Sequence, residues 1–249
     1  MLGFFLMKKS AGIQMLSVVI ASYNGEKFIA EQLDSILSQL NRSDEVIISD
    51  DGSNDGTLNI IREYQRKYSN IIFLNGPRQG VIKNFQFGIE NASGDIIFLA
   101  DQDDIWLPDK VQRVVSIFNH NETVSCVLHD VIVVDKTLHT IAPSFFELRK
   151  SKKGFFHNLI KNSFMGSAMA FRATAKEIIL PIPFDVPMHD QWIGLLCYLK
   201  GKVFFCNEKL GLYRRHGENA SSLEHGSLKT MIEKRIRLIV RLISRICRK

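Results

Sequence analysis

Strand-like and helix-like segments alternate along the first part of this chain, and that alternation constrains its fold more than any other feature. Short β-branched and apolar runs, typical of buried parallel strands, occupy residues 16–21, 45–49, 71–74 and 95–100. Apolar residues at helical spacing lie between them, at residues 28–37, 57–68 and 83–91. Such alternation with short connections predicts an α/β fold built on a mostly parallel, right-handed sheet.

The second part of the chain is less regular. We expect strands at residues 124–135, 164–172 and 210–214, and a helix at residues 190–199. A last helix begins near Leu228. Because 249 residues suit one substantial domain with an appendage, we predict a domain over residues 1–226 and a separate helix over residues 227–249.

The net charge of +6 is concentrated at the C-terminal end. Residues 227–249 hold three Lys and five Arg against one Glu, a net charge of +7, which leaves the rest of the chain at −1. This distribution argues against a nucleic-acid-binding face on the main domain. The four cysteines are widely spaced and form no CxxC pair, so we expect reduced thiols in a cytoplasmic protein.

The C-terminal segment is predicted to form a basic amphipathic helix. One broad face gathers its apolar residues, Leu228, Met231, Ile232, Ile236, Leu238, Ile239, Leu242, Ile243 and Ile246. The other face carries Arg237, Arg241, Arg245 and Arg248. Such a helix either packs on the domain or lies on an anionic membrane surface. The wide apolar face and the many cations favour the membrane.

Polar clusters follow three of the predicted strands at the point where each strand ends. They are Ser22-Tyr23-Asn24, Asp50-Asp51 and Asp101-Gln102-Asp103-Asp104. In open α/β sheets, ligands bind at the carboxyl ends of the strands. We therefore expect these clusters to converge on one site.

Asp101 and Asp103 directly follow an apolar strand, so both carboxylates point to the same side. Two hard oxygen ligands on a short turn suit Mg²⁺ or Mn²⁺ that also bridges a substrate diphosphate. The alternative is a solvated acidic turn, with Asp109 capping the next helix. The position at the end of a buried strand favours a metal site, and Asp104 receives no role.

Residues 50–56 partly imitate a calcium-binding loop, but Arg62 stands where that loop requires a bidentate Glu. The acidic pair at its start can form a turn and helix cap, or Asp51 can accept a hydrogen bond from a pyrimidine N3–H, and the two uses can coexist. The chain contains no GxGxxG, GxxxxGK[ST], HExxH or GxSxG motif. Dehydrogenases, P-loop proteins, zinc hydrolases and serine hydrolases are therefore disfavoured.

Three segments carry a specific combined pattern: VVIASYNGEKFIAEQLDSIL at residues 18–37, EVIISDDGSNDGT at 45–57 and GDIIFLADQDDIWLPDK at 94–110. Weaker matches follow in NSFMGSAMAFR at 162–172, MHDQW at 188–192 and YRRHGENAS at 213–221. Together they resemble glycosyltransferase family 2, which has the GT-A fold. The form DQDDIW resembles bacterial members that build O-antigen, capsule or rhamnose-containing polysaccharides.

The resemblance implies a nucleotide-sugar half over residues about 14–110 and an acceptor half over residues 111–226. Ala21, Tyr23 and Asn24 would line the nucleotide pocket after the first strand. Asp51 would contact the base, and Asp101 would lie near the ribose. Ala21 replaces the Pro of many relatives, which is a minor backbone change.

The same resemblance assigns the chemistry. Asp190 falls where similar enzymes have the catalytic base, and its alternative is a helix N-cap. Asp103 would hold the metal, with His216 as a further metal or phosphate contact, or else as an exposed loop histidine. Weaker acceptor or sugar contacts are Gly166, Trp106 and Trp192, although both tryptophans are more often core anchors.

The implied reaction is inverting transfer of a sugar from a UDP- or dTDP-sugar to a saccharide or polyprenyl-linked acceptor, with Mg²⁺ or Mn²⁺. It would take place at the cytoplasmic face of the cell membrane. One alternative is a sugar nucleotidyltransferase, which would normally show a Gly-rich, basic loop where this chain has Ser22-Tyr23-Asn24-Gly25-Glu26. Another is a non-catalytic nucleotide-binding module that partners other transferases.

Overall fold

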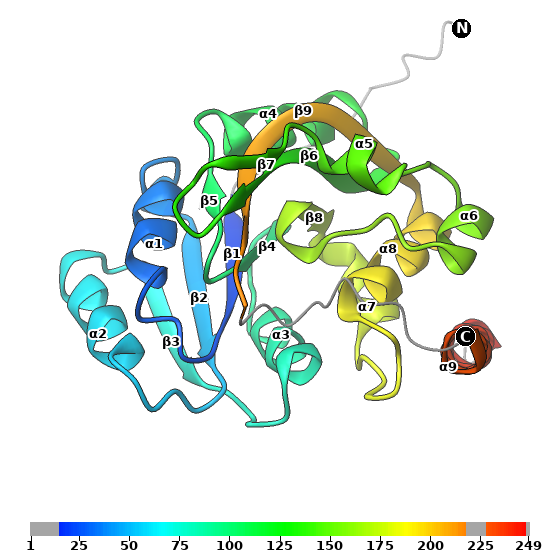
Figure 1. Ribbon diagram of the computed structural model, residues 1–249, viewed down its shortest axis with the longest axis horizontal. Helices are drawn as coiled ribbons and strands as arrows, with labels where there is room; N and C mark the ends of the chain where they lie inside the picture. The colour runs from blue at the N-terminus through cyan, green and yellow to red at the C-terminus, as the bar shows by residue number, and fades with distance from the viewer. Residues whose placement is uncertain (1–14, 218–227, 248–249) are drawn as a thin grey trace, which may run out of the picture.

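A computed structural model describes residues 15–217 and 228–247. Residues 218–221 of the YRRHGENAS motif and Arg248 of the tail lie outside the described residues. A curved sheet runs through the middle of the domain, with helices on both of its faces (Figure 1). Its strands follow the order β3-β2-β1-β4-β8-β6-β9-β5, and β7 pairs with β6.

The first half of the sheet is parallel, as the alternation predicts. It contains β1 (Leu16–Ser22), β2 (Glu45–Asp50), β3 (Ile71–Asn75) and β4 (Ile96–Asp101). The connecting helices are α1 (Ile29–Leu37), α2 (Thr57–Lys67) and α3 (Val81–Glu90). The α/β fold class is therefore confirmed, and each predicted element in this half exists.

The central strands are apolar on both faces because helices cover both. Val18 and Ile20 of β1 pack in one cluster with α1 and with α4 (Lys110–His120). Val19, between them in sequence, belongs to a second cluster with α3 and with α8 (His189–Lys200). Successive side chains of a strand point to opposite faces, so this one strand contributes to two cores.

The second half of the sheet is mixed. The long strands β6 (Val124–Asp135) and β9 (Lys202–Arg215) run parallel to each other, and β8 (Met169–Arg172) joins β6 to β4 in antiparallel pairing. The short strands β5 (Ile105–Trp106) and β7 (Thr140–Ala142) pair with β9 and β6. Small helices complete this half: α5 (Phe145–Arg149), α6 (Phe155–Ile160) and α7 (Lys176–Ile179).

Two strand predictions in this half need correction. The strand expected at 164–172 begins only at Met169, because Gly166–Ala168 form a 3₁₀ turn and Phe164 packs on Gly194 of α8. The strand expected at 210–214 extends over Lys202–Arg215. Its first part holds the short apolar run Val203–Cys206, which the prediction missed, and the polar residues Asn207-Glu208-Lys209 follow it. Pairing with β6 joins both parts into one strand, with shifts of register along the way.

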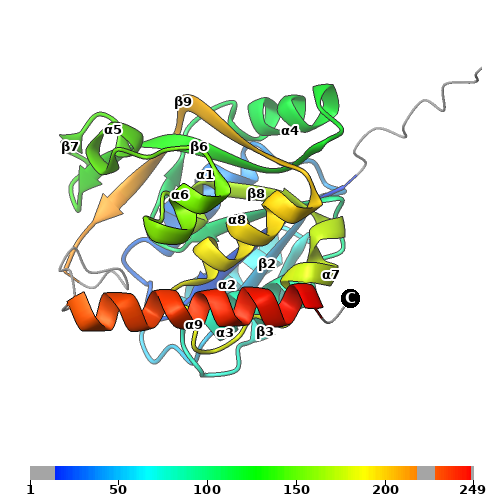
Figure 2. The same ribbon diagram turned by 90° about the vertical axis from the view of Figure 1, so that its right-hand side faces the viewer.

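The C-terminal helix α9 (Leu228–Cys247) packs on the domain next to α6 and α8 (Figure 2). Leu238 and Leu242 are buried and belong to the same core cluster as α8. No helix within residues 15–217 and 228–247 is long and apolar enough to cross a bilayer.

The docked helix α9 differs from the predicted arrangement of one apolar face and one opposite basic face. Arg241 and Arg245, expected to face away from the apolar side, both bind groups on the domain. Several isoleucines of the apolar face, including Ile232, Ile236 and Ile243, remain exposed. Only one edge of the apolar face is used for packing.

Leu242 and Ile243 are neighbours in sequence, and they give a matched test of this packing. Leu242→Ala should lower the free energy of unfolding by about 2–5 kcal/mol, because it leaves a cavity under the helix. Ile243→Ala, at a side chain that is 55% exposed, should change it by less than about 0.5 kcal/mol. Urea denaturation of both variants measures the difference, and equal losses would contradict the docked position of α9.

Candidate active site

The carboxyl ends of β1, β2 and β4 meet at one edge of the sheet. In the strand register Ser22 lies opposite Asp50, and Ala21 lies opposite Asp101. The three polar clusters predicted from the sequence are therefore brought together. Ala21 is half-buried on β1, whereas the side chain of Tyr23 is exposed.

Asp50, the last residue of β2, and Asp51, which follows it, have different surroundings. Asp50 is buried and accepts hydrogen bonds from the hydroxyls of Ser22 and Ser53, each at 2.6 Å, and from the amides of Gly52 and Ser53. Asp51 lies further out and accepts from the amide of Gly80, at 2.7 Å, just before α3. Asp50 therefore builds the turn, while Asp51 is only half-buried and binds the loop before α3.

The loop after β1 is fixed to the loop after β2. Asn24, in a left-handed conformation with φ of 49°, accepts from the amide of Asn54 and donates its own amide to the Ser53 hydroxyl. The carboxylate of Glu26 accepts from the amide of Gly56 at 2.6 Å. These bonds hold the loop that carries Tyr23 and Asn24 before any ligand binds.

Gln102 has a positioning role that sequence reasoning missed. Its side-chain oxygen accepts from the amide of Tyr23 at 2.9 Å, and its side-chain nitrogen donates to the carbonyl of the same residue at 2.8 Å. A Cβ on Gly25 would fall 2.2 Å from the same side chain. The glutamine thus joins the loop after β4 to the loop after β1, and Gly25 leaves it room.

Asp103 and His216 lie in direct contact although 113 residues separate them in the sequence. Oδ2 of Asp103 and Nε2 of His216 are 2.7 Å apart, and both side chains are only about a tenth exposed. The imidazole also stacks on Phe28, with ring centroids 4.9 Å apart. The end of β9 therefore reaches the acidic run after β4, which excludes the exposed-loop alternative for His216.

Arg214, two residues before this histidine, is a second residue that sequence reasoning missed. It is buried, and its amide donates to Oδ1 of Asp104 while its guanidinium donates to the carbonyl of Asp103. The guanidinium also pairs with Glu31 of α1 and lies over the ring of Phe28. The sequence Arg214-Arg215-His216 could have indicated this role, because the buried acidic run at residues 101–104 needs basic residues near it.

Lys110 supplies a further counter-charge inside the domain. It is 1% exposed, and its ammonium donates to the carbonyl of Ser167 and lies 4.1 Å from the ring centroid of Trp106. Burial lowers the pKa of Lys110 to about 7, against the opposing effect of Asp104 and Asp101. Burial and the charge of Asp103 raise the pKa of Asp104 to about 7.

Asp190 is the second residue of α8, which begins at His189. The N-cap is Met188, so Asp190 does not cap the helix. Its carboxylate accepts from the side chain of Asn162 and from the amide of Gln191. Burial raises the pKa of Asp190 to about 7, against those hydrogen bonds. Burial, and then the charges of Asp104, Asp103 and Asp190, raise the pKa of Asp101. The two halves of the chain thus contribute to one electrostatic site.

Gly166 acts through its backbone and its small size. Its amide favours the charged form of Asp190. A Cβ on this glycine would fall 2.7 Å from Nε2 of His189, which is buried and stacked on Phe85 at 4.2 Å. A side chain at position 166 would therefore disturb the start of α8.

Both tryptophans considered as sugar contacts are core residues. Trp106 is 3% exposed and packs on Phe98, and Trp192 is fully buried, with its indole nitrogen donating to the carbonyl of Ile179 at 2.8 Å. An acceptor sugar cannot stack on a ring that water does not reach. The weaker prediction of acceptor contacts is therefore corrected, and the alternative of core anchoring holds.

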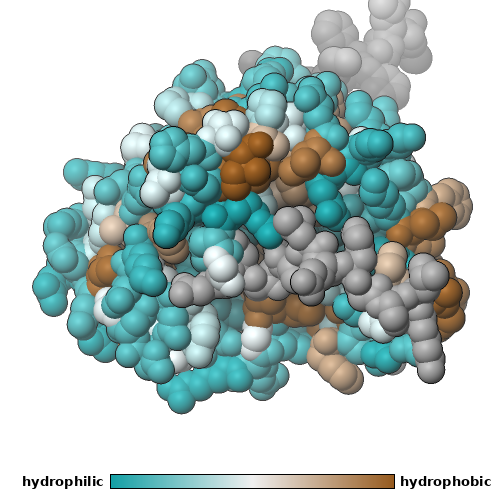
Figure 3. Space-filling model, in the orientation of Figure 1, coloured by the Kyte–Doolittle hydropathy of each residue, from teal (hydrophilic) through white to brown (hydrophobic). Residues whose placement is uncertain are grey.

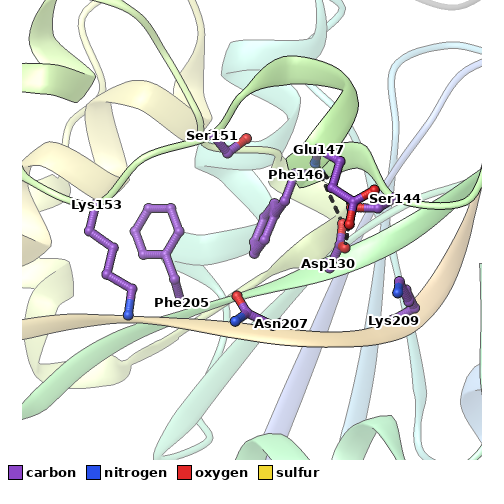
Figure 4. Close-up of a pocket in the computed structure, with 9 residues that line it drawn as sticks. All are labelled: Asp130, Ser144, Phe146, Glu147, Ser151, Lys153, Phe205, Asn207 and Lys209. Atoms are coloured by element: carbon purple, nitrogen blue, oxygen red, sulfur yellow. Dashed lines mark hydrogen bonds between the residues drawn. The ribbon is translucent and has the colours of Figure 1, made fainter.

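A separate cavity of about 400 Å³ opens between α5, β6 and β9 (Figure 4). Phe146 and Phe205 form its apolar walls, and Lys153 and Lys209 lie at its rim. Asp130 in its floor already accepts from the Ser144 hydroxyl at 2.6 Å. None of the site residues predicted from the sequence lines this cavity.

No group of three or more His, Cys, Asp or Glu side chains that could hold a metal ion occurs among the residues that the structure describes. The pair of Asp103 and His216 supplies one carboxylate and one imidazole. A cation held there needs further oxygen ligands from a substrate. That is the arrangement expected when a diphosphate completes the coordination.

A family model described as glycosyl transferase family 2 matches residues 17–178, which is more than half of the chain. The chain belongs to glycosyl transferase family 2. Among the most similar relatives of this glycosyltransferase is dTDP-rhamnosyl transferase RfbG of Shigella flexneri, which is 40% identical over 217 residues. That match covers 80% of this chain and 72% of the relative.

Solved structures share the fold of this chain. S. aureus TarS 1–349 in complex with UDP-GlcNAc has a TM-score of 0.72 at 20% identity, covering 92% of this glycosyltransferase and 66% of that chain. The mannosyltransferase PcManGT of Pyrobaculum calidifontis, in complex with GDP-Man and Mn²⁺, has a TM-score of 0.60 at 17% identity, covering 96% and 66%. These likenesses show the GT-A fold. The chain spans about two thirds of the length of the first curated relatives it matches.

The different environments of Asp50 and Asp51 generate a prediction. Asp50→Ala should lower the free energy of unfolding by about 2–4 kcal/mol, because buried donors in the turn lose their acceptor. Asp51→Ala should cost about 1 kcal/mol or less, since water can replace its bonds to the more exposed loop amides. Thermal denaturation of the two variants measures both losses. A larger loss of stability for Asp51→Ala than for Asp50→Ala would contradict the assignment of the structural role to Asp50.

Proposed function

We propose that this glycosyltransferase transfers a sugar with inversion from a nucleoside-diphosphate sugar, using Asp190 as the base and a divalent cation at Asp103 and His216. One observation carries the proposal. Asp190, a buried carboxylate with a pKa of about 7, lies within electrostatic reach of Asp101 at the end of β4. A carboxylate with that pKa is suited to accept a proton near neutral pH.

The chemistry requires few groups. Inversion is an in-line displacement at the anomeric carbon by an acceptor hydroxyl, and an alcohol is a weak nucleophile until a base removes its proton. Asp190 accepts that proton as the bond to the sugar forms and the bond to the diphosphate breaks. Asn162 and the first amides of α8 orient the carboxylate. No enzyme nucleophile is required, because the reaction has no covalent intermediate.

Asp103 and His216 fit a cation on the diphosphate. Their ligand atoms lie 2.7 Å apart, and Phe28 stacks on the imidazole. One carboxylate with one imidazole leaves most coordination positions for phosphate oxygens and water. Bound Mn²⁺ or Mg²⁺ would neutralise charge on the leaving diphosphate. Arg214 keeps the acidic run in position through the amide of its own backbone and through its guanidinium.

The fixed loops support the nucleotide assignment. Tyr23 and Asn24 would line the pocket, with Ala21 beneath them and Asp101 near the ribose. Asp51 would accept the N3–H of a pyrimidine base. RfbG is named as using a dTDP-sugar and TarS was solved with UDP-GlcNAc, so we propose a UDP- or dTDP-sugar as the donor.

We propose a saccharide or polyprenyl-linked acceptor and a role in bacterial surface polysaccharide synthesis, such as O-antigen assembly. The similarity to RfbG, a rhamnosyl transferase by name, supports this process. The transfer would take place at the inner face of the cell membrane, with the C-terminal helix in contact with anionic lipid.

Replacing the proposed base separates catalysis from binding. Asp190→Asn should lower donor turnover by about 10²–10⁴-fold, because the amide cannot accept the proton. Binding of UDP or dTDP, measured by calorimetry, should be unchanged. Asp34→Asn, at an exposed carboxyl on α1, is the control and should retain full activity. Full activity of Asp190→Asn would overturn the assignment and favour a non-catalytic nucleotide-binding module.

The pH profile is a second readout of the same residue. With a pKa of about 7, Asp190 is increasingly protonated at lower pH, so kcat/KM should fall by up to about tenfold per pH unit below 7. Above that pH the carboxylate is charged and the rate should reach a plateau on this side. The residual rate of Asp190→Asn should lack this fall. A flat native profile between pH 5 and 8 would contradict a base with this pKa.

Removing the cation tests the proposed metal site. EDTA should abolish turnover, and Mn²⁺ or Mg²⁺ should restore it. His216→Ala should raise the cation concentration needed for half-maximal rate by about tenfold or more, since one ligand is lost. His139→Ala, at a largely exposed histidine, should leave it unchanged. Undiminished activity after exhaustive chelation would exclude metal dependence.

A further inference from the structure

The docked helix α9 presents its apolar residues outward. Ile232, Ile236, Val240 and Ile243 are 55–58% exposed, and Ile246 is 45% exposed. These positions repeat at three- and four-residue intervals, so they form one continuous stripe along the helix. A stripe of this length on a helix that is already docked is not explained by packing within the domain.

Arginines, not isoleucines, hold much of the inner side of α9. Arg241 forms a two-pronged pair with the carboxylate of Asp185, and Arg245 donates to the carbonyls of Ile178 and Leu180. Arg235 donates to the carbonyl of Ile160 at 2.7 Å. These cations are committed to the domain, and their bonds fix which side of the helix faces outward.

Other elements place exposed apolar side chains beside α9. Phe156 and Ile160 of α6 are 78% and 74% exposed, and α6 contacts α9. Phe184 is 76% exposed and precedes Asp185, the partner of Arg241. In Figure 3 hydrophobic residues gather at the right-hand edge, where Figure 1 places α6 and α9. Three segments far apart in the sequence thus contribute to one apolar surface.

We propose that this surface docks on an anionic lipid bilayer. We define the docking surface as the outward stripe of α9, namely Ile232, Ile236, Val240, Ile243 and Ile246, together with Phe156, Ile160 and Phe184. Exposed patches of this kind on soluble domains mark interaction sites. Helices that lie in a membrane interface bury their apolar side chains to the depth of the headgroups.

Charge around the docking surface selects the lipid. Lys234 and Arg237 are exposed on α9, and Lys161 directly follows Ile160. Lys152 and Lys153, before α6, are exposed as well. Basic residues beside an inserted apolar stripe attract anionic headgroups. Arg237 has a long, exposed ion pair with Glu233 of the same helix, at 4.0 Å. The exposed basic residues outnumber this one acid, so they match a bilayer that contains anionic lipid.

A second copy of the chain fits this surface less well. A two-fold contact would bring the same patch of each copy together, so the basic rim of one copy would face the basic rim of the other. A bilayer has no such conflict. Docking on a bilayer is a property separate from the transfer reaction, because the docking surface includes neither the metal site nor Asp190.

Sedimentation of the full chain with vesicles tests the proposal. The native protein should bind vesicles of phosphatidylcholine and phosphatidylglycerol, and bind less to phosphatidylcholine alone. Ile236→Ser with Ile243→Ser should lower the partition coefficient by about tenfold or more. Phe156→Ser with Ile160→Ser should do the same, although these residues lie outside the C-terminal helix. Ile141→Ser with Leu148→Ser, at similarly exposed positions elsewhere, should bind as the native protein does.

Circular dichroism confirms that each variant is folded, since all the substituted side chains are exposed. The proposal is overturned if the native protein fails to bind anionic vesicles, or if both surface variants bind as well as the native protein. It is also overturned if light scattering finds a dimer that these substitutions dissociate, because the occupant is then a second copy. Asp190→Asn should bind vesicles normally, so loss of transfer and loss of docking are separate results.

Discussion

Asp101 ends β4, and Asp103 and Asp104 lie in the turn that follows it. Burial and mutual repulsion raise the pKa values of Asp101 and Asp104. Carboxylates held in such a place need positive partners, because an unpaired buried charge is strongly unfavourable. Lys110 of α4 provides a charge that opposes the rise in the pKa values of Asp101 and Asp104. From the far end of β9, the backbone amide of Arg214 donates to Asp104 and its guanidinium donates to the carbonyl of Asp103. The mixed half of the sheet therefore supplies contacts that hold the acidic turn of the parallel half in place.

That dependence explains what the sequence could predict. The parallel half can be predicted from local patterns. Each of its strands is a continuous apolar run, and in each helix the apolar residues repeat with a period of about 3.6. In β9 the apolar run Val203–Cys206 is short and is followed by the polar residues Asn207-Glu208-Lys209, and pairing with β6 carries the strand across this interruption. The segment before β8 looks like a strand until Phe164 is seen to pack on Gly194, which is a tertiary contact.

The candidate site divides in the same way. The strand ends predicted Asp51 and Asp103 as site residues, and the family resemblance predicted Asp190; their roles are those proposed above. Lys110 and Gln102 could not be found so, since their partners are distant in sequence and a single chain gives no sign of them. The helical wheel of the tail placed Arg241 and Arg245 away from the domain, whereas both bind groups on it. A guanidinium can bind backbone carbonyls at a domain edge, and hydrophobicity alone does not register those acceptors.

The tail also supports the helix that carries the proposed base. Arg235 contacts the side chain of Gln191, and Arg245 lies 5.3 Å from the ring centroid of Trp192, so α9 touches both residues that follow Asp190. A chain shortened to residue 227 would lose these contacts together with Leu238 and Leu242 of the core. Its inactivity would then reflect a loosened α8 as much as a protein that no longer finds its lipid. Under the docking proposal, one helix both supports α8 and binds the bilayer, so the two roles can be separated only by substituting one side chain at a time.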